Sequence, residues 1–63
     1  MGDTAAQLSS VRTSLEDLTK RVTDVADGYK GTDRDDVAVE LYEVERALLN
    51  AGRKLETVVR RLR

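Results

Sequence analysis

The chain has 63 residues and nearly balanced charge, with 11 basic and 12 acidic side chains and a formal net charge of −1. This length allows one small core, so we expect residues 1–63 to form a single domain. Cys and His are both absent, which excludes disulfides, thiol chemistry and the usual zinc and haem ligands, and the balanced charge favours neither nucleic acid nor an anionic membrane overall.

The chain shows no targeting or membrane-spanning pattern. No basic segment followed by an apolar run occurs near the N-terminus, and no apolar stretch approaches the roughly 20 residues that span a bilayer. We therefore expect a soluble, cytoplasmic protein that does not associate with a membrane.

The first predicted element is a helix over about residues 4–28. Its apolar residues alternate at intervals of three and four, which is the spacing of a heptad seam. They are Leu8, Val11, Leu15, Leu18, Val22, Val25 and Tyr29. The seam is flanked by Gln7, Ser14 and Arg21 at heptad position g and by Arg12, Thr19 and Ala26 at position e. The apolar stripe of the first helix is therefore narrow, and it can pack against fewer neighbouring helices than a wider stripe could.

A turn is expected at about residues 29–32, where Gly28 and Gly31 bracket the only convincing break in the periodic pattern. Capping-box spacing is found at the starts of both helices, in Thr4 with Gln7 and in Thr32 with Asp35. On the helix surfaces, acid-before-base pairs at i, i+4 spacing favour ion pairs. These pairs are Glu16 with Lys20, Asp17 with Arg21, and Glu56 with Arg60.

The second predicted helix covers about residues 33–62 and has a wider apolar arc. Leu41, Leu48, Leu55 and Leu62 take heptad position a, and Val37, Val44, Ala51 and Val58 take position d. Position e adds Ala38, Gly52 and Val59, and position b adds Tyr42 and Leu49. Only Glu45 and Glu56 interrupt this arc, which covers about half of the circumference. One partner helix cannot cover it, so the second helix needs two partners.

The second partner is predicted to be another copy of the chain. A lone hairpin of this size buries little apolar surface, and closed two-fold dimers are the commonest oligomers. The predicted fold is therefore all-α, an antiparallel helical hairpin that dimerises into a four-helix bundle. Its dimer core is predicted at Leu41, Val44, Leu48, Ala51, Gly52, Leu55 and Val58. Gly52 would allow another backbone to approach closely, the alternative being that it is simply tolerated. Within each hairpin, pairing a with d positions sets Leu15 beside Ala51.

Residues for catalysis or metal binding are scarce. The Ser and Thr hydroxyls of the first helix have no His to activate them. Asp36, Glu40 and Glu43 share a helical face and could hold Mg²⁺ or Ca²⁺, but such carboxylates equally suit the start of a helix. We predict no catalytic, cofactor-binding or metal-binding residues, and no enzyme.

Two surface features could carry a function. The first is a basic stripe on the second helix, formed by Arg46, Arg53, Lys54, Arg60 and Arg61, which could contact phosphates or could be a solvated face. The second is an apolar strip of Tyr42, Leu49 and Val59, which could dock another protein or could be buried in the bundle.

These features predict a small non-catalytic protein-interaction or regulatory module, with itself and another protein as partners. The first alternative is a nucleic-acid-binding regulator that uses the basic stripe, and salt-dependent binding to RNA or DNA would favour it. A further alternative is one subunit of a hetero-oligomer, which predicts a poorly folded isolated chain. A metal-dependent enzyme is the least favoured reading.

Overall fold

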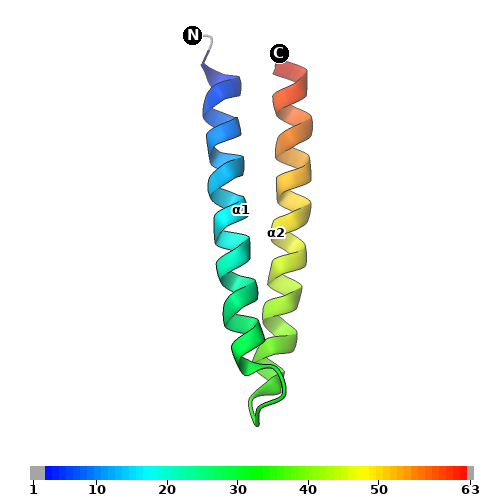
Figure 1. Cartoon of the computed structure of the whole chain (residues 1–63). Coiled ribbons are helices and arrows are strands. Elements are labelled where there is room, and N and C mark those ends of the chain that lie inside the picture. The colour runs from blue at the N-terminus through cyan, green and yellow to red at the C-terminus, as the bar shows by residue number, and fades with distance from the viewer. Residues whose placement is uncertain (1–2, 63) are drawn as a thin grey trace.

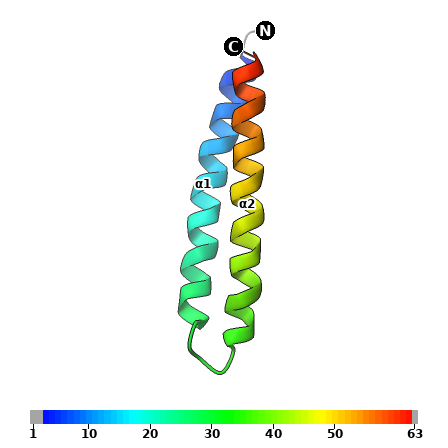
Figure 2. The same ribbon diagram turned by 90° about the vertical axis from the view of Figure 1, so that its right-hand side faces the viewer.

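The computed structural model describes residues 3–62, which form two antiparallel helices joined by a short turn. Helix α1 extends over Thr4–Tyr29 and helix α2 over Asp35–Leu62. The two helices lie side by side, and both chain ends lie at the end opposite the turn (Figures 1 and 2). The hairpin is 51 Å long. The predicted all-α hairpin is confirmed, and the turn covers residues 30–34 rather than about 29–32.

Helix α1 begins without the predicted capping box. Thr4 is already helical, and the N-cap residue is Asp3, whose side chain makes no capping hydrogen bond. The backbone N–H of Gln7 donates to the carbonyl of Asp3 at 2.8 Å, which closes the first helical turn. The start is therefore held by the backbone alone, one residue earlier than the expected cap.

The turn is stabilised by a compact set of hydrogen bonds. Gly31 has a φ of +79°, a conformation that glycine adopts at little cost. Its backbone N–H donates to Asp35 Oδ1 at 2.7 Å, and the N–H of Arg34 donates to Thr32 Oγ1 at 3.1 Å. Thr32 and Asp35 thus cap the start of α2 as a pair, although each accepts from a different N–H than a capping box requires.

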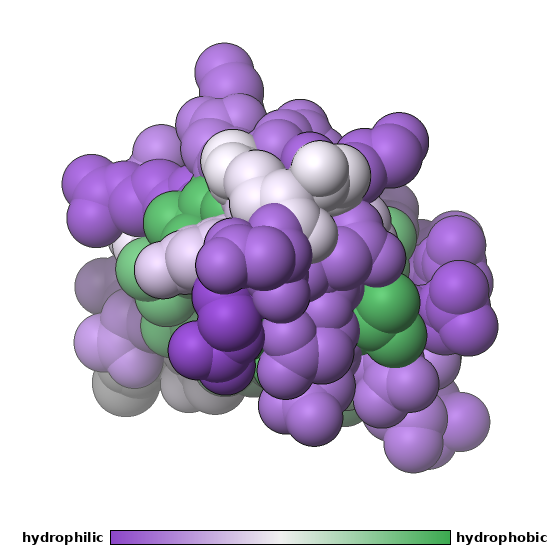
Figure 3. Space-filling model, turned by 90° about the horizontal axis from the view of Figure 1, so that it is seen from below, coloured by the Kyte–Doolittle hydropathy of each residue, from purple (hydrophilic) through white to green (hydrophobic). Residues whose placement is uncertain are grey.

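Few side chains are fully buried in the hairpin. Among residues 3–62, the buried ones are Thr19, Ala26, Ala38 and Val59, and no large side chain is fully buried. Viewed from the turn, the surface is mainly hydrophilic, with apolar side chains visible at its flanks (Figure 3). Neither helix is long and apolar enough to cross a membrane.

Candidate functional site

The two helices contact each other through heptad positions a and e. The four buried side chains all lie at position e, and the position a residues Leu15, Leu41 and Leu48 are half-buried. Leu15 Cδ2 lies 3.8 Å from where a Cβ on Gly52 would be. The predicted pairing of a with d positions, with Leu15 beside Ala51, is therefore wrong by about one residue. The small residues at position e let the two helices approach closely on that side of the seam.

The position d residues of both helices remain exposed except Val37, which is half-buried near the turn, and the exposed ones lie on the same side of the hairpin. Around each helix, position d lies beside position a, on the side away from position e. When two antiparallel helices face each other through positions a and e, their position d residues therefore lie on one common face. We call this surface the apolar face, and it consists of Val11, Leu18 and Val25 of α1 and Val44, Ala51 and Val58 of α2. Its five large side chains are 43–53 % exposed.

An open hollow of about 410 Å³ lies on the apolar face. Leu18 and Val25 of α1 line it together with Leu41 and Leu48 of α2. Position a leucines thus form its floor, while the position d side chains stand at its edge. A surface made in this way has knobs and holes into which the side chains of another helix pair can insert.

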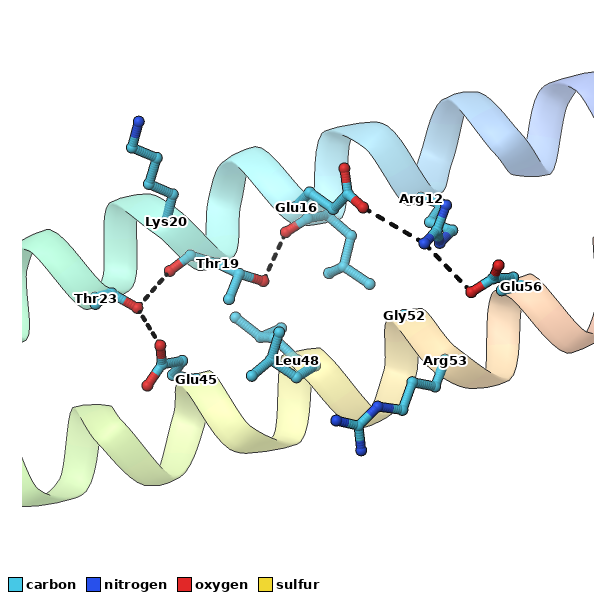
Figure 4. A pocket seen from close by; sticks show the side chains of 12 residues that line it. Arg12, Glu16, Thr19, Lys20, Thr23, Glu45, Leu48, Gly52, Arg53 and Glu56 are labelled. Carbon is cyan, nitrogen blue, oxygen red and sulfur yellow. Dashed lines mark hydrogen bonds and ion pairs between the residues drawn. The ribbon is translucent and has the colours of Figure 1, made fainter.

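The opposite face of the hairpin is polar. A groove of about 600 Å³ follows the helix pair there, and charged and hydroxyl side chains surround it. Arg12 lies between two carboxylates (Figure 4), with its Nη2 3.3 Å from Glu56 Oε1 and 3.6 Å from Glu16 Oε2. The Thr23 hydroxyl donates to Glu45 Oε2 at 2.7 Å, so both acidic residues that interrupt the apolar arc of α2 have partners on α1.

Only part of the predicted dimer core is accessible to another chain. Val44, Ala51 and Val58 are exposed on the apolar face, whereas Leu41, Leu48, Gly52 and Leu55 are half-buried by α1. The predicted dimer core did not include Val11, Leu18 and Val25, which are exposed on the same apolar face. The small residues at position e were the available signal, because they indicate on which side of each seam the helices come closest.

The three predicted docking residues have different environments. Val59 is only 3 % exposed and packs inside the hairpin, while Leu49 is 48 % exposed beside the polar groove. Tyr42 is half-buried, and its hydroxyl donates to Asp27 Oδ1 across the hairpin. This hydrogen bond raises the pKa of Tyr42 to about 12. The accessible part of the set is therefore Leu49, with Tyr42 beside it.

All five residues of the basic stripe are exposed on α2. Arg53 donates to Asn50 Oδ1 at 3.4 Å, and within residues 3–62 no member of the stripe forms an ion pair. Of the predicted i, i+4 pairs, Arg21 with Asp17 forms, at 3.2 Å. Glu16 and Glu56 instead both pair with Arg12, so Arg60 is left to solvent.

Asp36, Glu40 and Glu43 remain exposed along α2. In the described part of the chain, no group of three or more carboxylates is arranged so that it could hold a metal ion. Asp36 instead accepts from Arg34 Nε at 3.3 Å. Of the three, only Asp36 lies in the first turn of α2, where negative charge complements the helix dipole.

Comparison of the chain with protein-family models, curated proteins and solved structures gave no match.

Proposed function

We propose that the chain is a homodimer in which two apolar faces pack together as a four-helix bundle, and that this bundle serves as a non-catalytic protein-interaction or regulatory module. The observation that supports the proposal is the apolar face itself. A row of valine and leucine side chains stays about half exposed on one side of both helices, while the other side is polar. Contiguous apolar surface of this kind is typical of an interface between chains.

The dimensions of the hairpin suit a stable dimer. The apolar face extends over about 21 Å of the 51 Å hairpin and is two helices wide, at about 10 Å for each helix. Packing along the whole length of the hairpin, with the apolar face at the centre, would bury about 1,000 Å² on each chain, which is the size of a stable protein–protein interface. A second copy would also supply the core that one hairpin lacks, because the described residues 3–62 fully bury no large side chain and so gain little from their own packing.

Two substitutions of equal exposure on opposite faces test the dimer. Leu18 is 50 % exposed on the apolar face and Leu49 is 48 % exposed on the polar one. In sedimentation equilibrium, the wild-type chain and Leu49→Asp are expected to be dimers. Leu18→Asp is expected to be a monomer, because it would bury a charge in the interface. A dimeric Leu18→Asp chain would contradict the proposal, as would a monomeric wild type.

The polar groove would remain open in such a dimer, and we place the partner protein there. Leu49 supplies an exposed apolar anchor, and the surrounding charges supply a polar rim, which is the usual arrangement of a docking surface. The Leu49→Asp chain is then the appropriate control, since it keeps the dimer and loses the anchor. A partner protein that binds the wild-type and Leu49→Asp chains equally well would not be using the polar groove.

A second candidate function is binding to nucleic acid through the basic stripe. It is favoured by the exposure of all five residues and by the absence of ion pairs to them within residues 3–62. Arg46, Arg53 and Arg60 are each seven residues apart, or about 10 Å along the helix. Retention on RNA that falls steeply with salt, and that is lost when these residues are changed to Gln, would support this function over the first.

A further inference from the structure

Charge is segregated along the hairpin. The middle of its length lies near Asp17 of α1 and Leu48 of α2. The half that contains the turn, residues 17–48, has nine carboxylates and five basic side chains. The open half, residues 3–16 and 49–62, has three carboxylates and five basic side chains. The hairpin is therefore negative toward its turn and positive toward its open end.

The same gradient occurs along the edge of α2 that borders the apolar face. Heptad position g lies next to position d, and its residues are Glu40, Ala47, Lys54 and Arg61, all of them exposed. Glu40 and Arg61 lie on either side of Ala51 at nearly equal distances, about 15 Å each. A two-fold axis near Ala51 would thus place Glu40 of one copy opposite Arg61 of the other.

From this arrangement we infer that the second copy lies on the apolar face with its turn at the opposite end, so that α2 packs antiparallel to α2 of the other copy. The inference rests on the proposed dimer and adds its orientation. Each acidic end then lies over a basic end, and the g edges carry two Glu40–Arg61 pairs between the copies. Opposite charges across an interface favour this register over others.

The alternative two-fold arrangement places both turns at the same end. Helix α2 would then lie over α1 of the other copy, whose position g residues are Gln7, Ser14 and Arg21. None of these is a carboxylate, so the basic residues of the α2 edge gain no partner there. The two acidic turn halves would also lie over each other, which like charges disfavour.

The orientation has a consequence for the surface that the dimer presents. Each polar groove lies on the outside of the bundle, one on each side, and the two grooves run in opposite directions. A partner could therefore bind at two equivalent positions, related by the same two-fold axis. This geometry suits a module that joins two copies of one partner.

A spin-label distance measurement tests the orientation directly. The chain has no Cys, so Asp33→Cys places one label in the exposed turn of each copy. With the axis near Ala51, each Asp33 lies 18 residues, or about 27 Å, from the axis, so turns at opposite ends predict a label distance of about 55 Å. Turns at the same end predict less than about 25 Å. Asn50→Cys at mid-length is the control, because its label distance is short in both arrangements.

The two ways of failing are distinguishable. A wild-type chain that sediments as a monomer would overturn the proposed dimer, and the orientation with it. A dimer with a short Asp33→Cys distance and a short Asn50→Cys distance would overturn the orientation alone.

A charge-swap experiment tests the proposed pairing. Glu40→Arg and Arg61→Glu should each raise the dimer dissociation constant roughly tenfold at low salt, since each puts like charges at two positions of the interface. The double variant should return it to within about threefold of wild type. Single variants that leave the constant unchanged, or a double variant no tighter than the singles, would overturn the Glu40–Arg61 pairing.

Discussion

At the scale of single residues, Tyr42 and Gly52 show how α2 is placed against α1. The Tyr42 hydroxyl reaches Asp27 on α1, and Gly52 lies against Leu15 of the same helix. The contact of Tyr42 with Asp27 is polar and lies at the edge of the helix pair, whereas the contact of Gly52 with Leu15 is apolar and lies between the two helices. Each leads to a prediction that involves few other residues.

Tyr42 is predicted to titrate late and to make stability depend on alkaline pH. Only the protonated phenol can donate the hydrogen bond to Asp27, so this bond raises the pKa of Tyr42 from 10.0 to about 12. The resulting stabilisation is complete below pH 10 and is lost as the pH rises from 10 to 12. In a Tyr29→Phe chain, phenolate absorbance should have its midpoint near 12, and adding Asp27→Asn should return it toward 10. A midpoint near 10 in both chains would exclude the hydrogen bond.

Gly52→Ala is predicted to raise the free energy of unfolding by about 1 kcal per mole of chain. The new Cβ would meet Leu15 Cδ2 at 3.8 Å, an ordinary contact, so the gain in helix propensity is not offset by a clash. The matched control is Gly31→Ala, which should destabilise by about 1 kcal/mol because Gly31 has a φ of +79°. Urea unfolding at one protein concentration measures both. Destabilisation by Gly52→Ala would show that the helix pair does not accommodate the added Cβ against Leu15.

At the scale of the elements, polar contacts fix how the two helices are rotated about their axes. Arg12 joins Glu56 across the helix pair, and Thr23 joins Glu45 about three turns further along α1. Both contacts lie on the polar groove side, so they keep the polar side chains together and leave the position d residues on the other face. They therefore contribute to specificity, while the apolar contacts contribute most of the stability.

The Arg12–Glu56 pair is predicted to couple the two helices weakly. Both side chains are more than a third exposed, so solvent screens the pair. A double-mutant cycle with Arg12→Gln and Glu56→Gln should give a coupling energy of roughly 0.3–1 kcal/mol that decreases in salt. The same cycle on Asp17 and Arg21, which pair within α1 and are more exposed, should give no more than about 0.5 kcal/mol. Equal coupling in high and low salt would contradict this assignment.

At the scale of the whole molecule, stability is predicted to depend on protein concentration. One hairpin fully buries no large side chain within residues 3–62, so the proposed dimer would supply the missing core. Mass action then requires the melting temperature to fall on dilution. Circular dichroism over a hundredfold concentration range should show a decrease of several degrees. A melting temperature independent of concentration, with helicity retained, would show that one hairpin is stable by itself.

Periodicity alone was sufficient to predict the helices, the turn and the pair Asp17 with Arg21, because these depend on residues close together in the chain. The local partners predicted for Glu16 and Glu56 were wrong, since Arg12 reaches both carboxylates. Thr4 was likewise expected to cap a helix that begins one residue earlier. Glu16 pairs with its other i, i+4 neighbour, Glu56 pairs with a neighbour in space, and the start of α1 is held by the backbone itself.

The sequence by itself determined that this protein is a helical hairpin with an apolar stripe on each helix, since helix periodicity and turn residues are local properties. Only the tertiary structure decided which part of each stripe faces the other helix. A helix whose apolar stripe spans positions d, a and e can turn either the d edge or the e edge toward its partner helix and bury a similar apolar area. The small residues Thr19, Ala26, Ala38 and Gly52 at position e allow the closer approach, so that edge packs inward and the bulkier position d side chains remain outside.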